Sequence, residues 1–147
     1  MISIDYELED AGWAVAKIGN GLSERTIIVS YLHDTLKQLG ESAIYIKEAK
    51  AKRVVFMDEP GEHHLLISVV SEHELEFELR WFDDWTDWNA IEDENFELVL
   101  SGKTTIVNYV NEVRNVLLNI WSEFGPETYK KKWVNHEFPV NELETLK

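Results

Sequence analysis

Apolar and polar residues alternate along the first 29 residues, as they do in strands that bury one face. Ile2, Ile4 and Tyr6 form the first apolar run, and Trp13 and Val15 begin the second. A Gly-Asn-Gly turn then separates the second run from a third. The beginning of the chain therefore predicts strands joined by short turns.

The following segment has the period of a helix, with a plausible N-cap at Ser30. Its apolar residues fall on one stripe: Leu32, Leu36, Leu39, Ala43 and Ile46. Gly40 lies inside this stripe and would cost about 1 kcal/mol in a helix interior. The pattern therefore leaves two alternatives, a helix through Gly40 or one that ends there and leaves residues 44–46 extended.

Residues 53–82 predict three consecutive strands. The first covers residues 53–57, and Pro60 and Gly61 suit the central positions of a type II turn, so the second would start at His63. In the third, residues 73–82, glutamates alternate with apolar residues.

That alternation also predicts the register between the second and third strands. If residues 71–73 form the loop, His64 faces Arg80 and the apolar residues of both strands share one face. A slip by one residue would turn Glu74, Glu76 and Glu78 into the core, so the pattern strongly favours this register.

A further strand is predicted at residues 96–100 and a long helix at residues 104–124, followed by a short helix that opens at Pro126. Together the elements predict one α+β domain, residues 1–147. Its expected architecture is a single, mostly antiparallel sheet of five to seven strands with two main helices packed on one face.

Charge narrows the possible partners. The chain has a net charge of −14 and no cysteine. Like charges repel, so we expect no binding to nucleic acid or to an anionic membrane. The first residues lack the pattern of a secretory signal and no run is apolar enough to span a membrane, so we expect a cytoplasmic protein.

Half of the acidic residues lie in one stretch, residues 58–97, which holds fourteen Asp or Glu against the single base Arg80. The glutamates of residues 73–82 follow a strand period, but the acids after them follow no period. Trp is enriched in interface hot spots, and carboxylates accelerate the approach of a basic partner. We therefore predict a partner-binding site at Asp83, Asp84, Trp85, Asp87, Trp88, Glu92, Asp93 and Glu94.

Motifs for catalysis are weak, and we predict no catalytic residues and no cofactor. SGKTT at residues 101–105 resembles part of a phosphate loop, but Glu97 stands where the first glycine belongs, so a turn with a helix cap is expected. The acidic loop lacks the glycine of an EF-hand. A metal site on Glu76, Glu78 and His64 is the remaining chemical alternative.

Three motifs resemble those of a group of small uncharacterised bacterial proteins: SYLHDTL (30–36), FMDEPGE (56–62) and EFGPETYKKKW (123–133) followed by FP (138–139). This resemblance implies a bacterial, cytoplasmic setting and no catalytic residues. In size and charge the chain also resembles immunity proteins, which neutralise bacterial toxins.

The leading hypothesis is a non-enzymatic protein-binding module, a monomer or homodimer, whose partner is a basic protein. Its most concrete form is an immunity-type inhibitor that occludes a nuclease toxin. The alternatives are a divalent-metal-binding protein or metal-dependent hydrolase that uses the strand carboxylates, and a structural or regulatory subunit.

Overall fold

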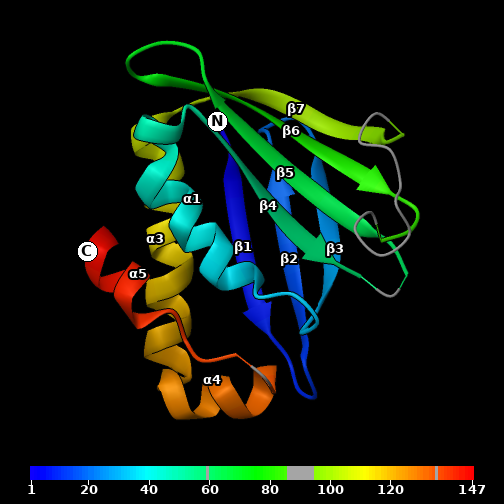
Figure 1. Cartoon of the computed structure of the whole chain (residues 1–147), viewed down its shortest axis with the longest axis vertical. Coiled ribbons are helices and arrows are strands. Elements are labelled where there is room, and N and C mark those ends of the chain that lie inside the picture. Colours follow the sequence, from blue (N-terminus) through cyan, green and yellow to red (C-terminus); the bar gives the residue numbers. More distant parts are fainter. Residues whose placement is uncertain (59, 86–94, 135) are drawn as a thin grey trace.

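The computed structural model describes residues 1–147 except 59, 86–94 and 135 (Figure 1). Its strands are β1 (Ser3–Leu8), β2 (Trp13–Gly19), β3 (Glu24–Ser30), β4 (Ala51–Met57), β5 (Glu62–Val69), β6 (Glu74–Phe82) and β7 (Glu97–Thr105). Its helices are α1 (Thr35–Ala49), α3 (Ile106–Glu123), α4 (Gly125–Trp133) and α5 (Val140–Leu146). In the described residues no helix is both long and apolar enough to cross a membrane.

The strands form two antiparallel sheets, one in the order β1-β2-β3 and one in the order β4-β5-β6-β7. The prediction of an α+β fold with antiparallel pairing is confirmed, but the prediction of a single sheet is wrong. Two hydrogen bonds close the outer edge of β4. On its free edge the Thr35 hydroxyl donates to the Val55 carbonyl (2.8 Å), and the Gln38 side chain accepts from the Val55 amide (2.7 Å). Helix α1 therefore occupies the edge of β4 to which a strand of the other sheet would have to pair to form a single sheet.

One apolar core joins both sheets and the helices. The two sheets lie one behind the other, and α1 and α3 run along one side of them (Figure 1). The inward side chains of β1 alternate with exposed ones, as the sequence pattern predicts: Ile4, Tyr6 and Leu8 are buried, and so is Ile2 just before the strand. The predicted register of β5 and β6 is confirmed, with His64 opposite Arg80.

Helix α1 starts later than predicted, and at Gly40 it follows the first of the two alternatives that the sequence left open. It begins at Thr35, because Ser30 is the last residue of β3. It then continues through Gly40 to Ala49 without a break. The predicted stripe is buried at Leu36, Leu39, Ala43 and Ile46, whereas Leu32 precedes the helix and is exposed.

Gly40 is required by packing and not by backbone conformation. A Cβ atom at this position would lie 2.9 Å from the Cβ of Glu142 on α5. We expect Gly40→Ala to lower the free energy of unfolding by about 1 kcal/mol, although alanine favours a helix by a similar amount. In the Glu142→Gly background the same substitution should stabilise the protein. Urea unfolding of the original protein, the two single variants and the double variant measures the free energy of unfolding in each background. Stabilisation by Gly40→Ala in the original protein would contradict the contact with Glu142.

Helix α3 begins at Ile106, two residues after its predicted start, because the strand before it is longer than predicted. β7 continues to Thr105, so residues 101–104 are strand and not a turn. The Thr105 side chain accepts from the Asn108 amide (3.0 Å), which confirms the expected helix cap. Gly125 follows the helix with φ +72°, a conformation that glycine adopts readily.

Candidate protein-binding surface

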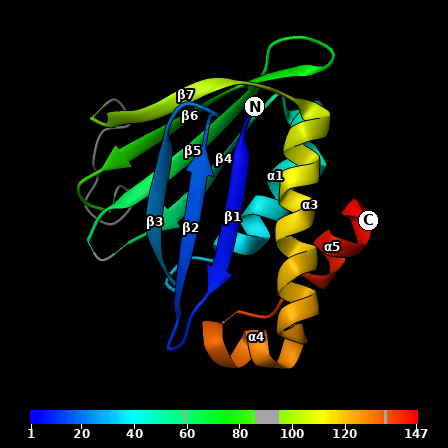
Figure 2. The same cartoon turned by 180° about the vertical axis from the view of Figure 1, so that it is seen from behind.

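Among the residues that the structure describes, no element covers the outer face of the three-stranded sheet. Figure 2 looks onto this face, with α3 alongside β1 and β3 at the opposite edge. The side chains that alternate with the buried ones point outward here: Asp5, Glu7, Val15, Lys17 and Ile28. Ile28 is 45% exposed, and Val15 is half-buried beside it in the register of β2 and β3. The face therefore combines apolar patches with charged borders.

A groove of about 790 Å³ runs between this sheet and α3. Residues 4–7 of β1 form one wall, Val15 and Lys17 of β2 extend it, and residues between 112 and 123 of α3 form the other. The side chains of Ile4 and Tyr6 are buried in the core. These two residues therefore reach the groove through their backbone, while Asp5 and Glu7 reach it through their side chains.

The groove is acidic. Four carboxylates line it, Asp5, Glu7, Glu112 and Glu123, against the single amine of Lys17. Low-dielectric walls around charges of one sign concentrate their field, so a concave acidic surface attracts cations more strongly than a flat one. The groove can therefore recognise positively charged side chains.

Sequence reasoning missed this groove. Residues 4–7 of one wall are more than one hundred residues from the α3 wall in the chain, and only the packing of α3 beside β1 brings them together. A partial signal was present on each wall. Asp5 and Glu7 share the polar face of a strand, and Glu112 and Glu123 are eleven residues apart, about three helical turns.

The predicted acidic loop is described only at its start. Asp83 is exposed, and Asp84 and Trp85 are half-buried. The Trp85 indole donates to the Asp58 carbonyl (2.8 Å), and the Asp84 carboxylate accepts from the Trp85 amide (2.8 Å). The other predicted residues lie outside the described residues: Asp87, Trp88, Glu92, Asp93 and Glu94. Partner binding by this loop stays a prediction.

The glutamates proposed for a metal site face basic side chains instead. Glu78 accepts from Arg80 (2.8 Å), and Glu76 lies 4.0 Å from Lys103 across the sheet. His64, on β5, contacts Arg53 and Glu62 and neither of these two glutamates. Among the residues that the structure describes, no group of three or more His, Asp or Glu side chains could hold a metal ion. No observation therefore favours the metal-binding alternative.

A buried polar network lies on β5. The Arg53 guanidinium donates to His64 Nδ1 (3.1 Å), and His64 Nε2 contacts the Glu62 carboxylate (2.7 Å). Because arginine only donates, Nδ1 is the acceptor and Nε2 carries the proton. Glu62 and His64 are 3% and 2% exposed. This network is screened from solvent, so we assign it to the stability of the β5 end of the sheet.

His63 points to the opposite side of β5 and packs on Trp81, with ring centroids 4.7 Å apart. Arg25 Nε donates to its Nε2 atom (3.1 Å), so the ring accepts there and is neutral. Burial, with the nearby positive charge of Arg25, lowers the pKa of His63 to about 4. The side chain is therefore built into the fold in its neutral form.

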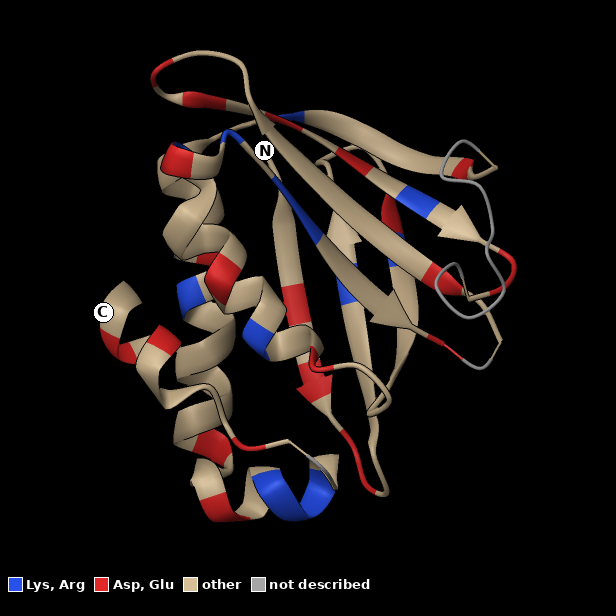
Figure 3. Cartoon of the chain, viewed as in Figure 1, with Lys and Arg blue, Asp and Glu red and all other residues tan. Residues whose placement is uncertain are grey.

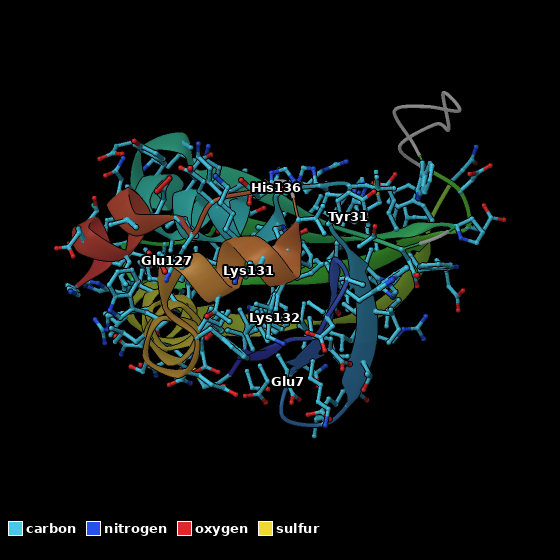
Figure 4. All side chains as sticks on the ribbon, turned by 90° about the horizontal axis from the view of Figure 1, so that it is seen from below. Glu7, Tyr31, Glu127, Lys131, Lys132 and His136 are labelled. Atoms are coloured by element: carbon cyan, nitrogen blue, oxygen red, sulfur yellow. The ribbon has the colours of Figure 1, made fainter. Side chains whose placement is uncertain are left out.

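The lysines of α4 pair locally. Lys132 contacts Asp10 (2.6 Å) and Lys130 contacts Glu137 (3.3 Å), and neither acid belongs to the acidic stretch of residues 58–97. Figure 3 shows these lysines as a basic band on α4. Figure 4 looks onto the same end of the molecule, where Glu7 and His136 lie on opposite sides of this helix. The basic end of α4 therefore lies at the turn between β1 and β2, which Lys132 contacts through its side chain and its carbonyl.

Comparisons with known proteins add little. No protein-family model matches the chain, and no curated protein matches it. Among solved structures, the chain is similar to one from a CdiA-CT/CdiI toxin and immunity complex of Enterobacter cloacae, with 11% sequence identity and a TM-score of 0.47. The similarity covers 79% of this chain and 98% of that chain. At this identity and TM-score it assigns neither a family nor an activity.

Proposed function

We propose that the chain is a non-enzymatic module that binds a basic protein, most concretely an immunity-type inhibitor that occludes a bacterial toxin such as a nuclease. One observation carries the proposal: the acidic groove beside an open sheet face. A concave surface with four carboxylates and one amine complements a cationic protein surface.

The open face supplies the second requirement of a protein interface. Stable interfaces combine an apolar centre with a polar rim. Val15 and Ile28 provide apolar area, and Asp5, Glu7 and Lys17 border it. Binding there would cover the partner's cationic surface, and a nuclease uses such a surface to hold nucleic acid. Inhibition would therefore follow from occlusion alone.

We expect association with the partner to be steered by charge. The immobilised protein is used to recover basic proteins from the native host, and each is then purified. Raising NaCl from about 20 mM to about 300 mM should slow association at least about tenfold, because salt screens the attraction. Dissociation should change much less, since short-range contacts set that rate. Stopped-flow fluorescence of the tryptophans measures both rates.

Two results would contradict the proposal. One is the recovery of no basic protein at physiological salt, and the other is an association rate that does not depend on salt. The triple variant Asp83→Lys, Asp84→Lys, Asp87→Lys tests the acidic loop separately. A loss of affinity in this variant would place the loop in the interface, and an unchanged affinity would restrict the interface to other acidic surfaces.

A further inference from the structure

We propose that the groove captures an extended basic segment of the partner, which pairs with the edge of β1 between Ile4 and Leu8 as a fourth strand of the three-stranded sheet. This inference rests on the proposed function and assigns it a binding mode. The carrying observation is that the acidic groove and an unpaired backbone edge coincide on the same strand.

The direction of the β1 backbone follows from its hydrogen bonds. In antiparallel pairs, every second residue bonds to the neighbouring strand and the residues between them point away. The Glu9 amide bonds to the Trp13 carbonyl (2.9 Å), while the Ile4 amide bonds to Glu112 on α3 (2.9 Å). The backbone groups of Ile4, Tyr6 and Leu8 therefore point away from β2, and Ile4 and Tyr6 line the groove.

Part of this edge is already occupied. Asn108 Nδ2 donates to the Ile2 carbonyl (3.0 Å), and Glu112 accepts from the Ile4 amide (2.9 Å). Beyond Ile4, the part of the chain that the structure describes supplies no partner to the amide and carbonyl of Tyr6 or to the Leu8 amide. α3 therefore closes the first half of the edge and leaves the second half available.

The β4 edge shows how this fold closes an edge that it does not use. There both backbone groups of Val55 are bonded by side chains of α1. Unpaired edges are ready templates for a further strand, and proteins usually cover or block them. The open half of β1 is therefore a suitable site for strand addition, a common mode of peptide recognition.

The side chains around the edge specify the occupant. From Ile4 to Leu8 a strand spans roughly 14 Å, and the groove of about 790 Å³ falls within the usual size of a ligand site, roughly 300–1,000 Å³. Alternate side chains of an added strand would lie beside Asp5 and Glu7, with Glu112 and Glu123 on the facing wall. Lysine or arginine at alternate positions satisfies these carboxylates.

A second copy of this chain is a poor occupant by the same criterion. Each copy carries a net charge of −14, so it would bring acids to an acidic groove. Anionic ligands meet the same repulsion. The charge of the groove therefore selects a basic segment of another protein.

The test uses an alternating peptide, acetyl-Lys-Val-Lys-Val-Lys-Val-Lys-amide, added to the full chain. We expect binding to protect the Tyr6 and Leu8 amides from hydrogen exchange by about tenfold or more, because both become paired. The Asp5 and Glu7 amides already bond to β2 and should change little. A peptide N-methylated at alternate residues, which cannot complete the ladder, should bind about tenfold more weakly.

Matched variants separate the groove from overall charge. Asp5→Asn with Glu7→Gln should weaken peptide binding about tenfold. Glu48→Gln with Glu72→Gln changes the net charge equally at exposed positions outside the groove, so it should leave binding nearly unchanged. Circular dichroism is the control that checks whether both double variants fold.

Absence of peptide binding, or binding without protection of the Tyr6 and Leu8 amides, would overturn the strand-addition inference. Equal weakening by both variant pairs would also overturn it, since net charge alone would then explain the binding. Light scattering identifies self-association as a separate outcome that would likewise exclude it. The proposed function is judged independently: recovery of a basic partner with salt-dependent association would support it even if these amides stay unprotected.

Discussion

Trp133→Ala should lower the free energy of unfolding by about 3–5 kcal/mol, the range for removing a large buried aromatic side chain. Trp133 is fully buried and belongs to the main core, although it lies in the short helix α4. The Lys132 carbonyl beside it accepts from the Gly12 amide (2.7 Å), between β1 and β2. Losing Trp133 therefore removes the apolar side chain that holds this end of α4 in the core. Urea unfolding followed by circular dichroism measures the change.

Trp133→Phe is the matched control. The indole Nε1 is buried and has no hydrogen-bond partner among the described residues. Phenylalanine keeps most of the apolar volume and removes this unpaired donor, so we expect a loss of less than about 1.5 kcal/mol. A loss of less than about 1 kcal/mol for Trp133→Ala would show that α4 contributes little to the core.

The free energy of unfolding should fall by about 3 kcal/mol through His63 alone when the pH is lowered from 6.5 to 4. The folded pKa of His63 is about 4, below the ordinary value of 6.5, because the ring is buried and Arg25 is close. Between these values the unfolded chain binds the proton and the folded chain does not. Stability is therefore complete above pH 6.5 and is lost progressively as the pH falls toward 4.

The 28 carboxylates of the chain also titrate in this range, so the effect is read as a difference between variants. His63→Gln can still accept from Arg25 but does not bind a proton, and its stability should decline less steeply with acid. His73→Gln, at an exposed histidine, should follow the original profile. If the profiles of His63→Gln and the original protein run parallel from pH 6.5 to 4, His63 is not held neutral by the fold.

Both predictions depend on residues whose role the sequence revealed only in part. Tyr129 and Trp133, four residues apart behind Gly125 and Pro126, predicted one buried face of a short helix, and both are fully buried. The adjacent His63 and His64 alternate faces in the sequence pattern. Their burial and their bonds to Arg25 and Arg53 depend on other strands and could not be read from the period.

The candidate sites show the same division. The acidic loop was visible in the sequence because charge density is a local property. The groove was not visible, because Asp5 and Glu112 belong to one surface only after α3 packs beside β1. The edge of β1 was also hidden, since a strand period indicates which side chains are buried and does not indicate which backbone groups find partners.

By itself the sequence determined the type of most elements, the buried face of β1 and the register of β5 with β6. Local periods carry that information, because a shifted register would bury three glutamates. Only the tertiary structure decided that the strands form two sheets and that α1 occupies the β4 edge while half of the β1 edge stays open. Edge pairing depends on contacts between residues distant in the chain, and alternation looks the same on a paired strand and on an unpaired one.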